Sequence, residues 1–223
     1  MLAFVDANVL AAPVPRTILY RAAAVPNVKF RLIYSHLVEA EAVEHQKAGH
    51  IPVDVLRSKH GWRIAHDPTS DEVKALALAD TDIKDQPVLA AALSRSAQFL
   101  ITGNVKHFGM KDLTRLGISA VHPGFFLAHQ LSSSQYTKVI EDIGRHRQRE
   151  PRTPLGIHET EIARELPQLF ERHRSIFGTP SPRQDGGIPR LDFRGTTCVR
   201  CSRPLTDTAS IAVGLGPTCR IAD

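Results

Sequence analysis

The sequence predicts an α/β protein built on a parallel sheet with helices on both of its faces. The first segment, LAFV, is an uninterrupted apolar run, as in strands that are buried on both faces. Four further short apolar segments follow it, so that the expected strands cover residues 2–5, 31–34, 62–65, 99–101 and 118–121. Helical patterns separate these strands, and such an alternation favours a parallel or mostly parallel sheet.

The helices expected between the strands have recognisable first turns. Pro13 and Pro15 delay the first helix, Ser35 and Asp71 are good N-caps, and Pro87 fits the first turn of an alanine-rich helix. The expected helices begin near residue 16 and cover 36–47, 53–59, 71–78 and 88–97. Alanine in the last of these allows the helix to pack closely against the sheet.

The pattern changes after the fifth strand, because no further strand is expected. Helical patterns over 125–130, 135–147 and 159–174 predict an extension, and a Gly-, Pro-, Ser- and Arg-rich stretch reads as a linker. We therefore expect an α/β domain over 1–125, a helical extension over 126–177, a linker over 178–195 and a cysteine-containing tail over 196–223.

Composition sets broad limits on function. The chain has 223 residues, of which 42% are hydrophobic, and a formal net charge of +5, which permits an anionic partner without requiring one. No apolar run reaches the roughly 18 residues that span a bilayer. The N-terminus lacks the basic region of a signal peptide, so we expect a cytoplasmic protein without membrane partners.

Polar residues gather where the expected strands end and helices begin. Asp6 follows the first strand, Asp85 precedes the alanine-rich helix, and the turn from Thr102 to Asn104 follows the strand 99–101. In a parallel sheet these positions share the carboxyl edge, where ligands bind. Each acid can also be a simple helix cap, and Asn8 can serve either role.

Two further groups of acids lie near this edge. Glu39 and Glu41 belong to the helix 36–47, where acids are ordinary partners of the helix dipole. Being two residues apart, they do not share a face, so at most one points into a site. Asp82 lies in the loop before Asp85, and Asp80 beside it is expected to be solvated.

Several carboxylates at one edge repel each other unless a cation neutralises them. Carboxylate and amide oxygens are ligands for a hard divalent cation such as Mg²⁺ or Mn²⁺. Such a cluster is typical of phosphodiester hydrolysis, in which the metal activates water and stabilises charge on the reacting oxygens.

The segments FVDANVL, SHLVEAE, DIKDQPVLAAAL and ITGNVKHF resemble PIN-domain ribonucleases, and more narrowly VapC-type toxins of bacterial toxin–antitoxin systems. They occur in the order of that family over roughly residues 1–125. The resemblance implies a PIN-like sheet and a Mg²⁺-dependent endoribonuclease that inhibits translation. It also implies an RNA substrate, for which tRNA and rRNA loops are candidates, an antitoxin partner and a homodimer.

The resemblance assigns roles to individual positions. It implies that Asp6 and Asp85 bind the metal and that Glu41, with Glu39 as the alternative, is the helical acid of the site. It makes Asn104 the fourth catalytic position, with supporting residues Asn8, Asp82 and Thr102. Many PIN nucleases carry an aspartate where this chain has Asn104, so the site has one negative charge fewer. His107 either approaches a scissile phosphate or lies on the surface.

The last segment carries all three cysteines. Cys198 and Cys201 have CxxC spacing and Cys219 follows, which in a reducing compartment indicates metal binding before a disulfide. The tail resembles a small zinc-binding motif, and we expect Zn²⁺. Structural zinc has four ligands, and the fourth is left open among Asp207, Asp223, the terminal carboxylate, a water and a partner chain.

Two other functions compete with the nuclease. A non-catalytic nucleic-acid-binding module would have a degenerate acid site and would use the tail for recognition. A structural protein would bind neither RNA nor Mg²⁺.

The helical extension resembles that behind some VapC-type domains, in HPGFFLAHQL, and can support the RNA, the dimer or the antitoxin. A group of four arginines at 145, 147, 149 and 152 either meets phosphate or lies solvated at a helix end.

Overall fold

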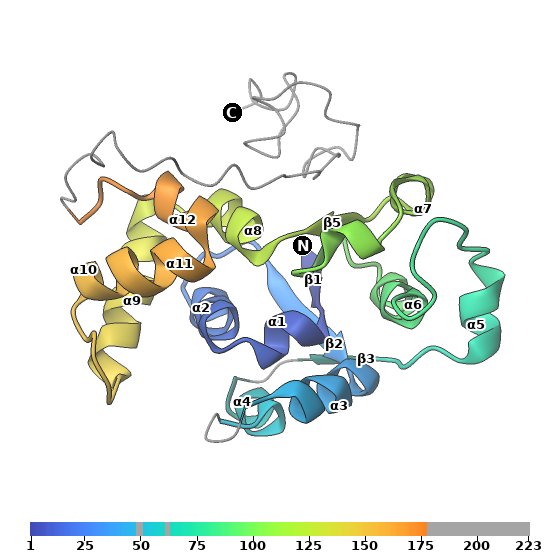
Figure 1. Ribbon diagram of the computed structural model, residues 1–223, viewed down its shortest axis with the longest axis horizontal. Coiled ribbons are helices and arrows are strands. Elements are labelled where there is room, and N and C mark those ends of the chain that lie inside the picture. Colours follow the sequence, from blue (N-terminus) through green and yellow to red (C-terminus); the bar gives the residue numbers. More distant parts are fainter. Residues whose placement is uncertain (48–50, 61–62, 178–223) are drawn as a thin grey trace.

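The computed structural model describes residues 1–47, 51–60 and 63–177. Its centre is a five-stranded, wholly parallel sheet in the order β3-β2-β1-β4-β5 (Figure 1). The strands are β1 (Leu2–Val5), β2 (Arg31–Ser35), β3 (Arg63–Ala65), β4 (Phe99–Ile101) and β5 (Ser119–Val121). The five predicted strands and their parallel pairing are therefore confirmed.

The order of the strands reverses between β1 and β4, which makes this the switch point where ligands bind in such sheets. The register places Val5 opposite Ile101, so both strands end at the same level. The backbone N–H of Asp6 then donates to the carbonyl of Ile101 at 3.0 Å. The register thus brings the residues that follow β1 and β4 side by side.

Helices cover both faces of the sheet, with α1 and α2 on one side and α5 and α6 on the other (Figure 1). The elements between strands are α1 (Ala7–Ala11), α2 (Pro13–Ala23), α3 (His36–His45), α4 (Val53–His60), α5 (Ser70–Ala75), α6 (Gln86–Ser94) and α7 (Met110–Leu116). Alanine side chains of α6, which packs against the sheet, are buried; Ala91 and Ala92 have no solvent exposure. The predicted close packing of this helix is confirmed.

The expected start of the first helix near residue 16 is wrong. The side chain of Asp6 caps α1, which begins at Ala7, and α2 begins directly at Pro13. Proline is tolerated in the first helical turn, since the N–H that it lacks has no helical partner there. Prolines at 13 and 15 therefore mark the beginning of α2 and do not delay it.

The expected cap and end of α5 are also wrong. Thr69 caps the helix, and its hydroxyl accepts from the N–H of Glu72 while the Glu72 carboxylate accepts from the N–H of Thr69. This reciprocal pair satisfies two free N–H groups at once, which favours Thr69 over Asp71. The helix α7 was not expected at all; it ends at Gly117, whose φ of 69° suits glycine.

The extension is entirely helical within the described residues. It consists of α8 (Pro123–Gln130), α9 (Ser133–His146), α10 (Pro154–Ile157), a π-helical turn η2 (His158–Ile162), α11 (Ala163–Glu165) and α12 (Pro167–Arg172). The single helix expected over 159–174 is broken, because Pro167 supplies no N–H and starts α12 as a new helix. The domain boundary expected after residue 125 falls inside α8.

One hydrophobic core runs from the sheet into the extension. Phe4 and Leu100 lie at its centre without solvent contact. Phe126 of α8 packs edge-to-face on Phe30 and Phe99, with ring centroids 4.9 and 5.5 Å away, so the extension shares this core. Among the helices that the structure describes, none has the length and apolar character needed to cross a membrane.

Candidate active site

Asp6 lies at the carboxyl end of the central strand and is only 3% exposed. Its Oδ1 accepts from the N–H of Ala7 at 2.7 Å, and its Oδ2 accepts from the Thr102 hydroxyl at 2.6 Å and from the Asn8 amide. A carboxylate has about four acceptor positions. Three are filled by the protein, so one position, on Oδ1, stays open to a ligand.

The turn after β4 supports this carboxylate. Thr102 is fully buried, and its Oγ1 accepts from the N–H of Asn104 at 3.0 Å and from the Asn8 amide at 3.1 Å. The Asn8 carbonyl oxygen accepts from the N–H of Gly103 at 2.8 Å. Asn8 and Thr102 thus connect the first turn of α1 to the turn after β4 and fix the direction of the Asp6 carboxylate.

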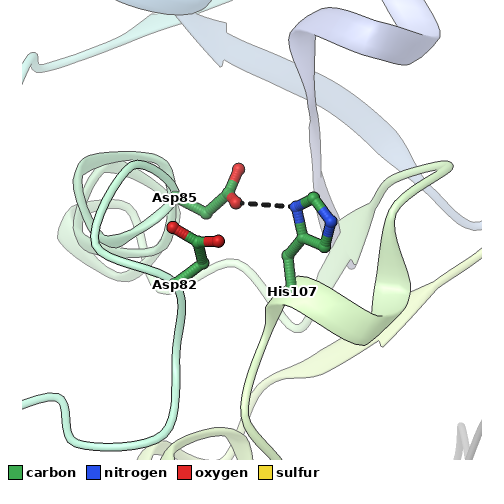
Figure 2. Close-up of side chains that lie close together, drawn as sticks. All are labelled: Asp82, Asp85 and His107. Atoms are coloured by element: carbon green, nitrogen blue, oxygen red, sulfur yellow. Dashed lines mark hydrogen bonds and ion pairs between the residues drawn. The ribbon is translucent and has the colours of Figure 1, made fainter.

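Asp85 stands immediately before α6 but makes no hydrogen bond to cap it. Its Oδ2 instead meets Nδ1 of His107 at 3.1 Å, and Figure 2 shows the two side chains pointing toward each other. His107 belongs to the short 3₁₀ helix η1 (Val105–His107). Asp82 joins them from the loop before α6, so that ligand atoms of the three residues lie within 4.8 Å of one another.

Backbone hydrogen bonds hold this loop in place. The N–H of Asp82 donates to the carbonyl of His107 at 2.8 Å. Asp112 of α7, 3% exposed, accepts from the N–H groups of Ala79, Asp80 and Thr81 at 3.3, 2.9 and 2.9 Å. Burial opposes ionisation of Asp112, but these N–H groups prevail and lower its pKa. Asp112 thereby positions the loop that carries Asp82.

The two candidate acids of α3 have different surroundings. Glu39 is 8% exposed and lies 3.4 Å from Nδ1 of His36, one turn earlier. Glu41 is exposed; burial is the main cause that raises the pKa of Asp6, and the charge of Glu41 adds a smaller effect in the same direction. Glu41 therefore lies near enough to Asp6 for its charge to act there.

Asn104 is exposed at the start of η1, and its side chain does not cap that turn. Its carbonyl accepts from the N–H of His107 at 2.9 Å. Asn104 thus adds an exposed residue beside Thr102, and its amide brings no charge.

Two other acids act on the Asp6 carboxyl. Burial raises the pKa of Asp6, hydrogen bonds from Thr102 and Ala7 lower it, and the charges of Asp85 and Glu41 raise it again. Asp85 stands before α6 and Glu41 lies on α3, so this repulsion reaches Asp6 from two other segments of the chain. A divalent cation would relieve this repulsion, and its preferred ligands are the carboxylate and amide oxygens found here. The residues present therefore fit such an ion.

Sequence reasoning anticipated some of these contacts and missed others. It placed Asp6, Asp85 and Thr102 at one edge; in the structure Thr102 donates to Asp6, while Asp85 contacts His107 and acts on Asp6 through its charge. It missed the pairing of His107 with Asp85 and the role of Asp112. An acid in a first helical turn resembles an ordinary dipole partner, so the sequence carried no distinguishing signal for Asp112. Cys198, Cys201 and Cys219 lie outside the described residues.

Comparison with known proteins finds a similarity to a protein of Mycobacterium tuberculosis (strain ATCC 25618 / H37Rv) that is named "Putative ribonuclease VapC50". The two are 33% identical over 109 residues, which cover 48% of this chain and 64% of the relative. The chain thus spans less than two thirds of that relative's length. Residues 192–220 match a family of unknown function (DUF6011). No solved structure matches the chain significantly.

The similarity and the sheet agree at a coarse level. A five-stranded parallel sheet flanked by helices is compatible with a PIN-like α/β fold, and the relative's name describes a ribonuclease. The described residues also contain an acidic group, Asp82, Asp85 and His107, that can hold a metal ion.

Proposed function

We propose that this protein is a Mg²⁺-dependent endoribonuclease of the PIN type and the toxin of a toxin–antitoxin pair. The observation that carries the proposal is that Thr102 donates to the buried Asp6 at the switch point of the parallel sheet, with Asp85 and Glu41 near enough for their charges to act on Asp6. The similarity to a protein named as a ribonuclease supports the same activity.

In this proposal Asp6, Glu41 and Asp85 hold the cation, with Asn104 beside them. A bound Mg²⁺ would lower the pKa of a coordinated water and offset the charge that develops on the phosphate. Thr102 and Asn8 keep one oxygen of Asp6 occupied, so that its free position on Oδ1 has a fixed direction. Asp82, which lies with Asp85 and His107 in a group that can hold a metal ion, would add a carboxylate from the loop before α6.

His107 has a positioning role in the proposed reaction. Its Nδ1 is held by Asp85 at 3.1 Å, so the ring is oriented and the remaining nitrogen, Nε2, is directed away from that carboxylate. A partly exposed imidazole held in this way can donate to a phosphate oxygen of the RNA. The exposed Asn104 amide can meet the same backbone.

Cleavage of a structured RNA by the purified full chain tests the proposal. We expect Mg²⁺-dependent cleavage that falls by at least about 100-fold in Asp85→Asn and Asp6→Asn, because each change removes a charged ligand. Asp71→Asn serves as the matched control, since Asp71 is an exposed acid of α5 in an ion pair with Lys74. Full activity in both site variants would refute the nuclease assignment.

Toxicity and translation inhibition follow from the same site in this proposal. Expression of the wild-type chain should arrest growth, Asp85→Asn should not, and an antitoxin should restore growth. Equal arrest by both proteins would contradict a nuclease mechanism of toxicity.

Single-stranded loops of tRNA or rRNA are the proposed substrates, because unpaired bases can be read directly. A homodimer is proposed by resemblance and is tested by sedimentation.

The tail is proposed to bind one Zn²⁺ through Cys198, Cys201 and Cys219. The CxxC spacing and the third cysteine support this, and the fourth ligand stays open. We expect about one zinc per full chain by elemental analysis, and loss of this zinc in Cys198→Ser. Zinc retained at the same stoichiometry in Cys198→Ser would contradict the assignment. If the protein binds RNA equally well with Mg²⁺ and in EDTA, once the tail zinc is accounted for, and cleaves it in neither condition, the alternative of a non-catalytic binding module holds.

A further inference from the structure

Apart from the candidate active site, the described residues form a cavity between α2, the end of α9 and η2. Its volume is about 520 Å³, within the range of small-molecule sites. Apolar side chains form most of its wall, including Val14, Ile18, Leu56, Ile143 and Ile157. None of the acids of the candidate active site lines this cavity, so it is a separate site.

Four arginines also line the cavity, and two of them are already paired. Arg21 of α2 donates to Asp142 at 2.6 Å, and Arg147 donates through both of its terminal nitrogens to Glu161. These two pairs join α2 to α9 and α9 to η2. They leave no excess charge in the cavity, because each guanidinium faces one carboxylate.

Arg16 is different because it is buried and forms no ion pair with the residues that the structure describes. Its side chain lines the cavity, it is only 4% exposed, and its Nε and Nη1 have no hydrogen-bond partner among the described residues. Burial lowers the pKa of Arg16, yet a guanidinium stays protonated at neutral pH. A buried cation without a partner is strongly unfavourable. No described residue supplies such a partner, and a bound anion would supply it.

Arg149 adds a second available charge at the edge of the cavity. It is exposed and makes no hydrogen bond within the described part of the chain, and its charge reaches Glu161. Guanidinium groups suit phosphate, since their planar donors can bind two oxygens at once. Two arginines beside a largely apolar wall match a ligand with a phosphate at one end and a weakly polar body at the other.

We propose that this cavity binds a nucleotide, with its phosphate on Arg16 and Arg149 and its base against the apolar wall of α2 and α9. The volume exceeds what a phosphate group alone would fill, which favours the organic phosphate. The nucleotide is either free or one unit of an RNA chain. This inference does not depend on nuclease activity, because Arg16 and Arg149 lie apart from the acids.

Calorimetric titration of the full chain, without added Mg²⁺ and at constant ionic strength, tests the proposal with AMP, adenosine and a short oligoadenylate RNA. We expect AMP to bind the wild-type chain and adenosine to bind at least about tenfold more weakly, because adenosine lacks the phosphate. Arg16→Met should weaken AMP by a similar factor. Arg95→Met, at an exposed arginine beyond α6, is the matched control and should bind AMP normally.

Two further results show whether the bound nucleotide is free or part of an RNA chain, and whether it binds in this cavity or at the acids. Binding of the oligonucleotide without AMP would identify an RNA unit as the ligand, and binding of AMP would identify a free nucleotide. Asp85→Asn should retain AMP binding, so failure of the nuclease proposal would leave this one intact. Loss of AMP binding in that variant would place the nucleotide at the acids and overturn the inference.

The stability of the variant provides an independent readout. Without ligand, Arg16→Met should melt at a higher temperature than the wild type, because an unpaired buried charge is replaced by an apolar side chain of similar length. AMP should raise the melting temperature of the wild type more than that of Arg16→Met. If Arg16→Met does not fold, Arg149→Met replaces it in the titration. Absence of AMP and oligonucleotide binding at millimolar concentration, or equal binding by the variants, would overturn the proposal.

Discussion

Thr102 determines how Asp6 presents its carboxylate. The Thr102 hydroxyl donates to Oδ2 of Asp6 at 2.6 Å. Its oxygen, Oγ1, also accepts from the N–H of Asn104 and from the Asn8 amide. Asp6 and Thr102 are buried and Asn8 is half-buried, so water does not readily replace the hydroxyl as a donor to Asp6. The threonine therefore acts on the site through Asp6 and not through contact with RNA.

Thr102→Val tests this positioning role, because valine keeps the shape and removes the hydroxyl. We expect a loss of about 1–2 kcal/mol in the free energy of unfolding, since the Asp6 carboxylate loses a donor in a buried place. RNA cleavage should fall about 10–100-fold, as for other groups that orient a metal ligand. Thr102→Ser keeps the hydroxyl and is the control. Wild-type cleavage by the valine variant would contradict the role.

The positions of Asp6 and Thr102 were predictable because each directly follows a strand, β1 or β4. A residue that follows a parallel strand must lie at the carboxyl edge, whatever the tertiary packing. The choice between Glu39 and Glu41 was harder, because the rotation of a helix about its axis depends on what the helix packs against. The contact between His107 and Asp85 depends on the path of two loops, which no local pattern encodes.

At the scale of elements, α7 fastens the loop that precedes α6. Asp112 in its first turn accepts three backbone N–H groups of residues 79–81, and Gly109 before it has no room for a side chain against Asp80. The helix itself was not predicted, because it is short and follows a turn. Prolines also misled the prediction, since those at 13 and 167 start helices.

Asp112→Asn should loosen this loop. The amide accepts fewer hydrogen bonds than the carboxylate and carries no charge, so we expect a loss of about 1–3 kcal/mol in the free energy of unfolding. Denaturation in guanidinium chloride measures it. Asp71→Asn, at an exposed acid, should change stability by no more than about 0.5 kcal/mol. Equal stability of the two variants would show that Asp112 does not anchor the loop.

At the scale of the whole molecule, the extension and the sheet form one packed body. Arg21 of α2 pairs with Asp142 of α9, and Phe126 of α8 packs on Phe30. The interior of the extension is unusual because it contains two buried histidines. Tyr136 donates to, or accepts from, Nδ1 of His158 at 2.6 Å, and the ring of His173 stacks on Tyr136 at 4.3 Å.

This arrangement makes stability depend on pH in a defined direction. Burial lowers the pKa of His158 and of His173 to about 4, below the ordinary value of 6.5. Between these values the unfolded chain binds protons that the folded chain does not, so the stabilising contribution is complete above pH 6.5 and declines as the pH falls toward 4. We expect about 1–2 kcal/mol to be lost per histidine between pH 7 and pH 5.

His173→Phe isolates one half of this effect. Neither ring nitrogen of His173 has a hydrogen-bond partner among the described residues, so phenylalanine can keep the stacking on Tyr136 without losing a polar contact. The variant should match or exceed the wild type at pH 7 and should lose only about half as much stability on going to pH 5. Unfolding in guanidinium chloride at both pH values measures the difference, with His45→Gln at an exposed histidine as the control. An unchanged pH dependence in His173→Phe would mean that His173 is protonated without cost in the folded chain, and that the acid sensitivity of the extension has another source.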